Sequence, residues 1–87
     1  MIKADGFDDC IIGFADVWDG NKRVVRIIYD AMRMVHVLMD RDGMTEDEAV
    51  EYFEFNIESA YVGKSTPVYM FQATLEDIEE LTEILDE

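Results

Sequence analysis

The chain has 87 residues, of which 49% are hydrophobic. This length and composition predict a single small domain, residues 1–87, with its own hydrophobic core. With 21 acidic against 7 basic residues, the net charge of −14 excludes the basic surface that proteins use to bind nucleic acids or anionic membranes. The single cysteine excludes an intrachain disulfide and fits a reducing cytoplasm, and no apolar segment has the ~20 residues of a membrane helix.

A β-hairpin is predicted near the N-terminus. Residues 10–18 and 23–29 are rich in aliphatic and aromatic side chains that favour strands. Asp19-Gly20-Asn21 lies between them and favours a tight turn, because glycine and asparagine tolerate positive φ angles. Apolar residues occupy both alternating sets of positions in the first strand, so both of its faces are expected to be at least half buried.

A first helix is predicted over residues 31–41. Asp30 is suited to cap its N-terminus, and Gly43 is suited to the left-handed conformation that follows a helix. Its core-facing residues recur at the spacing of one helical face and are Ala31, Met34, Val35 and Leu38.

A second helix is predicted to begin at Thr45, which forms a capping box with Glu48. This helix is expected to run to about Val62, with Gly63 as its stop signal. Its expected core stripe consists of Ala49, Val50, Phe53, Ile57, Ala60 and Tyr61.

A third strand over residues 67–72 and a last helix from Thr74 complete the chain, with Asp77 at the third position of that helix. The fold class is therefore predicted to be α+β, a small three-stranded antiparallel sheet with helices packed on it, in the order β-β-α-α-β-α. Alternatively, one of the three helices is left to face a partner chain. The apolar stripe of the last helix is Leu75, Ile78, Leu81, Ile84 and Leu85.

The acidic residues are concentrated in the second half of the chain. Residues 44–87 hold 13 of them and one basic residue, Lys64. In both helices of this half the acids recur at steps of four, three and four, which aligns them along one helical face. The hypothesis is a negative surface that meets a basic protein surface; the alternative is a solvated face, as in a proteome that is acidic throughout. The expected contact residues are Asp47, Glu51, Glu54, Glu58, Glu76, Glu80 and Glu83.

Three aromatic residues are candidates for an interface. Trp18 ends the first strand, and Tyr52 and Phe55 lie beside the core stripe of the second helix. Together with an exposed strand edge, these side chains support a second hypothesis, a structural or assembly module that acts as a homodimer.

The sequence predicts no catalytic residue, cofactor or metal site. Residues 40–43 (DRDG) are similar to the centre of an EF-hand loop, but the required first and twelfth ligands would be Leu38 and Ala49. His36 is expected on a helix surface without partners, and Cys10 follows two acidic residues that raise its pKa.

An enzyme is the third hypothesis. It would use a divalent metal held by Asp8, Asp9 and Asp30, whereas loop solubility and helix capping explain the same three residues without chemistry.

One stretch resembles a family of small bacteriophage and prophage proteins. It comprises residues 42–70 (DGMTEDEAVEYFEFNIESAYVGKSTPVYM) with GFDDCIIG at 6–13, and its recurring elements are DG, EA, EYFEFN, AYVG and TP. The resemblance covers about half of the chain and implies a phage accessory protein made in the cytoplasm of the bacterial host. Small acidic phage proteins include inhibitors of host defence such as anti-CRISPR proteins, some of which mimic DNA, and the similarity to these is one of size and charge.

Overall fold

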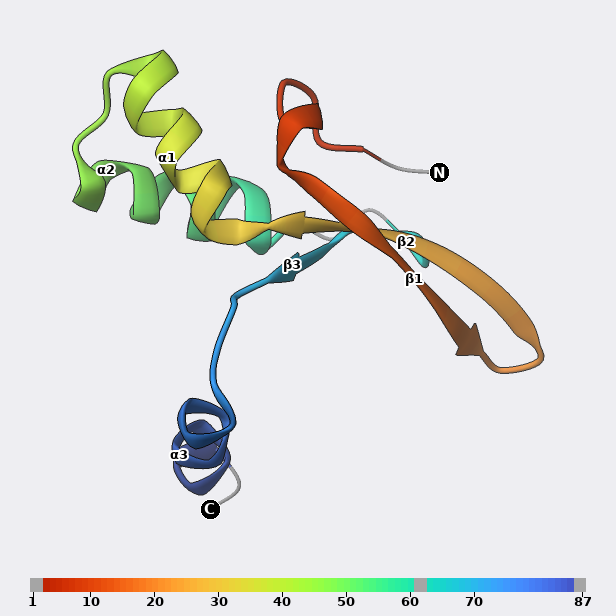
Figure 1. Ribbon diagram of the computed structural model, residues 1–87. Helices are drawn as coiled ribbons and strands as arrows, with labels where there is room; N and C mark the ends of the chain where they lie inside the picture. Colours follow the sequence, from red (N-terminus) through yellow and green to blue (C-terminus); the bar gives the residue numbers. More distant parts are fainter. Residues whose placement is uncertain (1–2, 61–62, 86–87) are drawn as a thin grey trace.

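The computed structural model describes residues 3–60 and 63–85, with side chains to Thr82. The elements follow the predicted order and confirm the α+β class (Figure 1). They are η1 (Asp8–Cys10), β1 (Ile11–Asp19), β2 (Lys22–Asp30), α1 (Ala31–Asp42), α2 (Glu46–Tyr52), η2 (Phe53–Glu58), β3 (Val68–Met70) and α3 (Leu75–Leu85).

Strands β1 and β2 form the predicted hairpin, with Asp19 opposite Lys22 across a two-residue turn. Gly20 opens that turn with a φ angle of 64°, in the left-handed region that favours glycine. The expectation that both faces of β1 are at least half buried is wrong, because Phe14 and Trp18 are exposed where the hairpin extends beyond the helices.

Strand β3 completes the sheet in the order β1-β2-β3, but it runs parallel to β2, so the sheet is mixed and not purely antiparallel. Helix α1 carries the chain onward from the end of β2, and α2 with η2 returns it, so that Val68 enters beside Ile28 in the direction of β2 (Figure 1). A parallel pair requires such a crossover connection. Pairing stops where Met70 lies opposite Asp30, because β2 itself ends there.

The core forms where α1, α2 and η2 pack on the ends of β2 and β3. Tyr29 of β2 is fully buried, and its ring stacks on Tyr69 of β3 at a centroid distance of 5.8 Å. Phe53 of η2 contacts Tyr69 edge-on at 5.5 Å. The Tyr29 hydroxyl accepts a hydrogen bond of 2.8 Å from the Ala4 N–H, which holds the N-terminal segment against the core. All four residues predicted for the core face of α1 are buried: Ala31, Met34, Val35 and Leu38.

The second predicted helix changes character halfway. After α2 the chain continues as the π-helical segment η2, in which the Ser59 N–H donates to the Glu54 carbonyl five residues earlier. The helix ends at Glu58 and not near Val62, and the Ser59 hydroxyl donates to the Phe55 carbonyl at this end.

The core stripe of this helix is confirmed at Ala49, Phe53 and Ile57, which are buried. Val50 is half-buried, and Ala60 is exposed because it lies beyond the helix end. Tyr61 and Val62 lie outside the described residues, and the expected stop signal Gly63 belongs to the loop after the helix.

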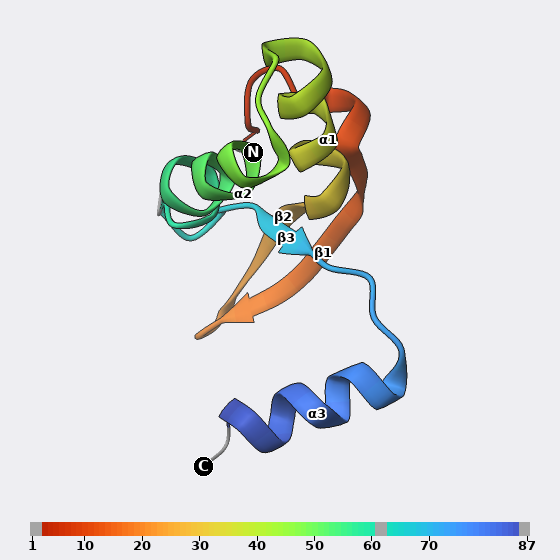
Figure 2. The ribbon, with the colours of Figure 1, turned by 90° about the vertical axis from the view of Figure 1, so that its left-hand side faces the viewer.

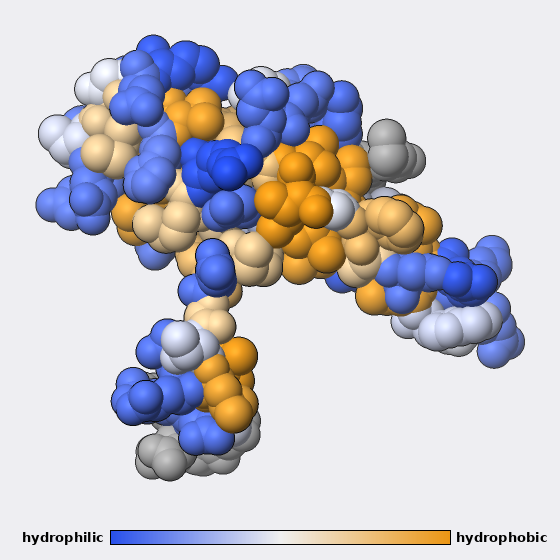
Figure 3. All heavy atoms as spheres, in the orientation of Figure 1, coloured by the Kyte–Doolittle hydropathy of each residue, from blue (hydrophilic) through white to orange (hydrophobic). Residues whose placement is uncertain are grey.

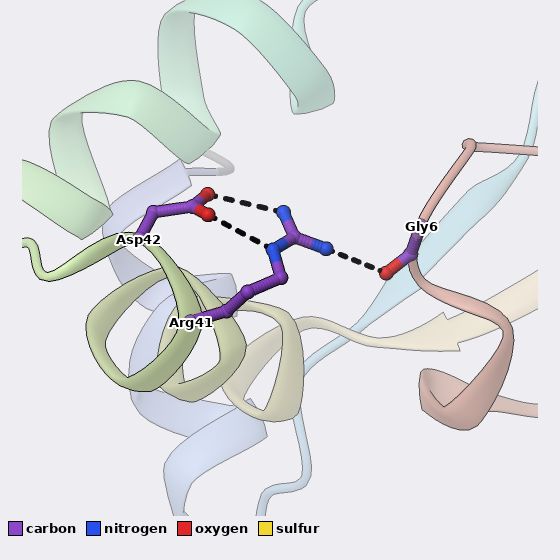
Figure 4. A network of polar contacts seen from close by, with 3 residues as sticks. All are labelled: Gly6, Arg41 and Asp42. Carbon is purple, nitrogen blue, oxygen red and sulfur yellow. Dashed lines mark hydrogen bonds and ion pairs between the residues drawn. The ribbon is translucent and has the colours of Figure 1, made fainter.

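Arg41 fastens the N-terminal segment to the end of α1 (Figure 4). Its guanidinium group donates to the Asp42 carboxylate at 2.9 and 3.0 Å and to the Gly6 carbonyl at 2.9 Å, and it lies 5.0 Å from the centre of the Phe7 ring. These hydrogen bonds from Arg41 lower the pKa of Asp42. Gly6 has a φ angle of 86°, and a Cβ atom there would lie 2.9 Å from the Arg41 side chain.

Helix α3 stands apart from the sheet, beyond the connecting residues 71–74 (Figures 1 and 2). Leu75, Ile78 and Leu81 of its apolar stripe are exposed. Among the side chains that the structure describes, none from α3 belongs to the core. Among the described residues, α1 and α2 with η2 therefore cover the sheet, and the described part of the apolar side of α3 remains uncovered.

Candidate protein-interaction surface

The α2–η2 ridge, residues 46–58, is an exposed helical surface whose start is fixed by the predicted capping box. The Thr45 N–H donates to the Glu48 carboxylate at 2.9 Å, and the Glu48 N–H donates to the Thr45 hydroxyl at 3.2 Å. The hydrogen bond from the Thr45 backbone lowers the pKa of Glu48, and the hydrogen bond with the Thr45 side chain lowers it further. The cap thereby sets the direction in which the ridge leaves the turn, with Ala49 and Phe53 facing the core.

A hollow of about 410 Å³ lies along the ridge. The rings of Tyr52 and Phe55 line it beside the carboxylates of Glu48 and Glu51, and Phe55 is 72% exposed. An aromatic face next to a carboxylate is the environment that a guanidinium or ammonium group prefers. The hollow therefore suits an arginine or lysine side chain with apolar neighbours. Its remaining lining residues are Met44 and Asn56.

The predicted acidic contact residues of the ridge are exposed and have no cationic partner in the described part of the chain. No lysine, arginine or histidine nitrogen lies within 4.0 Å of their carboxylates. The ion pairs that do form lie elsewhere and are Lys3–Asp8, Arg23–Asp16, Arg41–Asp42 and Lys64–Asp19. The negative charge of the ridge is thus left for solvent or a partner.

The ridge does not present its four acids in a single line. Asp47 and Glu51 lie on α2, where residues four apart share a face. Glu54 and Glu58 lie on η2, a π-helical segment whose hydrogen bonds span five residues. The rotation from one residue to the next is therefore smaller than in an α-helix, which changes the direction of these two side chains relative to those of α2. Asp47 also lies in the first turn of α2, where free backbone N–H groups favour a negative charge, so its charge stabilises the helix as well.

The acids of α3 form a separate surface, because α3 lies apart from the ridge in both views (Figures 1 and 2). Glu76 and Glu80 are exposed on it. Thr74 and Asp77 cap this helix with two reciprocal hydrogen bonds of 3.2 Å. Glu83 belongs to α3, but its side chain lies outside the described part. The fold thus distributes the predicted contact residues over two surfaces.

Trp18 lies on a third part of the molecule, the end of the hairpin, where it is 69% exposed. The Arg23 guanidinium lies 5.9 Å from the centre of its indole ring. Sequence reasoning missed Phe14 as an interface residue, although its position four residues before Trp18 puts both on one strand face. It also missed Asn56, although it follows Tyr52 by four residues on the same helical segment, and Met44, which lies in the turn before α2.

The cysteine, the histidine and the aspartates that were considered for catalysis or metal binding are buried in the core, engaged in caps and ion pairs, or exposed on a helix. Cys10 is fully buried, and burial raises the pKa of its thiol. The Asp30 carboxylate accepts from the Arg33 N–H at 3.2 Å and caps α1, while Asp8 pairs with Lys3. His36 is exposed on α1, as predicted. Within residues 3–60 and 63–85, no group of three or more His, Cys, Asp or Glu side chains is placed to hold a metal ion.

No protein-family model, curated protein or solved structure matches this chain. No helix in the described part of the chain has the length and apolar character needed to span a membrane.

Proposed function

We propose that this protein is a non-enzymatic interaction protein whose α2–η2 ridge docks on a basic surface of another protein. The observation that carries the proposal is the hollow of the ridge, where the exposed rings of Tyr52 and Phe55 lie beside Glu51. Glu51 has no cationic partner among the described residues. Exposed aromatic rings combined with unneutralised carboxylates favour a partner that brings both apolar surface and positive charge.

The carboxylates of the ridge would attract the partner while it approaches, and the aromatic rings would contact it in the complex. Unneutralised carboxylates attract a basic partner over about 8–10 Å at physiological salt and raise the association rate. The rings of Tyr52 and Phe55 then supply apolar area and a face for a guanidinium group. Asp47, Glu54 and Glu58 would extend the negative surface on either side of the hollow.

We further propose that the partner binds nucleic acid through the same basic surface, so that docking of the ridge inhibits it. A row of carboxylates offers the negative charge that such a surface normally finds in phosphates. The resemblance to phage proteins favours a defence protein of the bacterial host as the target, in the host cytoplasm, in the manner of anti-CRISPR proteins.

A titration with synthetic peptides tests the ridge. An arginine-rich peptide with interspersed leucines should shift the NMR signals of Tyr52 and Phe55, and its affinity should fall as salt is raised. Glu51→Lys combined with Phe55→Ser should weaken binding at least about tenfold. The matched control is Glu80→Lys on α3, which changes the net charge equally at another surface.

Equal affinity of the ridge variant and the wild type would overturn this proposal. Equal losses in the ridge variant and the α3 control would mean that net charge alone drives binding, which also contradicts a defined docking site. The inhibitory role is tested by competition: a captured host partner should lose nucleic-acid binding when the wild-type chain is added and keep it when the ridge variant is added.

A further inference from the structure

An arginine, an aromatic ring and a carboxylate meet at the end of α1. The Arg41 guanidinium lies 5.0 Å from the centre of the Phe7 ring and donates hydrogen bonds of 2.9 and 3.0 Å to the Asp42 carboxylate. It donates a third hydrogen bond, of 2.9 Å, to the Gly6 carbonyl. A guanidinium group can make all these contacts at once, because its flat face is free for a ring while its N–H groups point outward in the plane.

The same combination occurs a second time, on the hairpin. The Arg23 guanidinium lies 5.9 Å from the centre of the Trp18 ring and donates to both carboxylate oxygens of Asp16. The Arg23 side chain is 64% exposed in this arrangement. A ring and a carboxylate therefore hold an arginine in this fold even where water has access.

The lysines that form ion pairs do so without a ring. Lys3 pairs with Asp8 at 3.2 Å, and Lys64 pairs with Asp19 at 3.1 Å. In the described part of the chain, both arginines that pair with a carboxylate lie over a ring, and neither of these lysines does. The compact charge of lysine is satisfied by a carboxylate alone, whereas the planar charge of arginine gains from a ring as well.

The hollow of the α2–η2 ridge offers the same groups without a cation. Tyr52 and Phe55 supply rings that are 41% and 72% exposed. Glu51 supplies a carboxylate, and Asn56 supplies an amide oxygen comparable to the Gly6 carbonyl beside Arg41. Within the described part of the chain, no ion pair or hydrogen bond engages the side chains of Glu51 and Asn56. Hydrophilic and hydrophobic residues lie side by side over α2 (Figure 3).

A second carboxylate of the hollow is already held in place. One oxygen of Glu48 accepts the hydrogen bond of 2.9 Å from the Thr45 N–H in the capping box. Its other oxygen accepts no hydrogen bond from the described residues. Glu48 precedes Tyr52 by one helical turn and so lies beside that ring. Because the cap orders this side chain before a partner arrives, binding to it costs less conformational entropy than binding to a free carboxylate.

We propose that the hollow of the ridge binds a single arginine side chain of the partner and selects arginine over lysine. This inference rests on the function proposed above and adds to it the side chain that the hollow recognises. The guanidinium group lies over the ring of Phe55 or Tyr52 and donates to a carboxylate at the rim. The volume of about 410 Å³ is within the range of sites that enclose a small ligand. A partner that binds phosphates through this arginine would lose it to the hollow.

Two peptides of equal charge test the selection. The first is the arginine-rich peptide with interspersed leucines, and the second carries lysine at every arginine position. Calorimetric titration at one salt concentration should give the arginine peptide at least about fivefold higher affinity for the wild-type chain. The δ-methylene protons of the bound arginine should shift upfield in NMR spectra, because they lie over an aromatic ring.

Two matched substitutions locate the ring. Phe55→Leu keeps an apolar side chain in the hollow but removes its ring, so the preference for arginine should fall to about half of the wild-type value or less. Phe14→Leu makes the same change on the hairpin and should leave the preference unchanged. Phe55 and Phe14 are 72% and 67% exposed, so both variants should fold with an unchanged circular dichroism spectrum.

A series of lysine peptides with a single arginine tests whether one arginine is enough. The arginine is placed at each basic position in turn. At least one of these peptides should regain most of the affinity of the arginine peptide, because the hollow receives one guanidinium group. An even rise of affinity with the number of arginines would overturn the proposal, since it indicates a diffuse attraction to the acidic surface.

The outcomes distinguish this inference from the proposed function. Equal affinities of the arginine and lysine peptides would overturn the selection of arginine. The proposed function would stand in that case, provided that Glu51→Lys with Phe55→Ser still weakens binding of both peptides. A preference for arginine that survives Phe55→Leu, or that falls equally in Phe14→Leu, would place the arginine elsewhere and overturn the inference. Failure of both peptides to bind would contradict the proposed function and this inference with it.

Discussion

Helices α1 and α3 are amphipathic helices of similar length, 12 and 11 residues, yet they differ in burial. The apolar stripe of α1 is buried against β2 and α2, while the described residues of the α3 stripe are exposed. The reason lies in the connections. Helix α1 follows β2 without a break at Asp30, so its position on the sheet is fixed, whereas four residues separate β3 from α3. An amphipathic pattern thus predicts that a helix side is to be covered and leaves open what covers it.

The largest effect expected from this contrast is at Phe53, which is buried among the rings of Tyr69 and Phe71. Phe53→Ala should lower the free energy of unfolding by about 3–5 kcal/mol, because a buried ring is replaced by a cavity. Urea denaturation followed by circular dichroism measures this loss. Phe55→Ala, two residues away and exposed, is the matched control and should change stability by less than about 0.5 kcal/mol. Similar losses in both variants would contradict the burial described for the ridge.

A smaller effect is expected at Gly6, where the N-terminal segment meets Arg41. Gly6→Ala should destabilise the fold by about 1–2 kcal/mol, because alanine disfavours a positive φ angle and its Cβ would crowd the Arg41 guanidinium group. Thermal unfolding of this variant and of Gly13→Ala gives the comparison. Gly13 has an ordinary φ angle and no neighbouring atom within 4 Å of an added Cβ. An equal loss of stability in Gly13→Ala would therefore contradict a specific role for the contact between Gly6 and Arg41.

Removing the two helix caps one at a time should show whether the stability of the core depends on α3. Thr45→Ala should lower the free energy of unfolding of the core by about 1 kcal/mol, because the capping box of α2 loses its hydroxyl. Thr74→Ala removes the equivalent hydroxyl from α3 and should reduce helix content without shifting the unfolding midpoint of the core. Hydrogen exchange of the core amides distinguishes the two; equal shifts would mean that α3 is coupled to the core.

The smallest expected effect concerns pH and Glu48. Its pKa is lowered from the ordinary value of 4.5 by hydrogen bonds from Thr45, so the ionised form stabilises the fold above that value, and this contribution is lost as the pH falls through the lowered pKa. Glu48→Gln should therefore be less stable than the wild type near pH 7, and the difference should vanish in strong acid. A difference that persists unchanged to about pH 2 would contradict a role for the charge.

Local sequence signals predicted the elements because each signal acts within a few residues. The capping residues Asp30 and Thr45, the turn at Gly20 and the stop at Gly43 all have the predicted geometry. The core faces of α1 and α2 follow from helical spacing for the same reason. The exceptions lie where the chain departs from regular geometry, as in η2, which ends the helix at Glu58 and divides the acidic row of the ridge.

The candidate surfaces were predictable only in part. Exposure of Tyr52 and Phe55 beside Glu51 follows from their helix positions, but the hollow that they line also needs Met44 from the preceding turn. Matching spacing in two helices indicated a shared acidic surface, yet the spacing holds no information on how far apart the two helices lie.

By itself the sequence determined the element types, their order, their caps and the apolar side of each helix, since these depend on contacts within one or two turns of chain. Only the tertiary structure decided the direction of β3, the separation of the two acidic surfaces and the exposure of α3 and of the hairpin end that carries Phe14 and Trp18. Each of these depends on where a connection returns the chain, and hence on packing between residues distant in sequence, which no local pattern encodes.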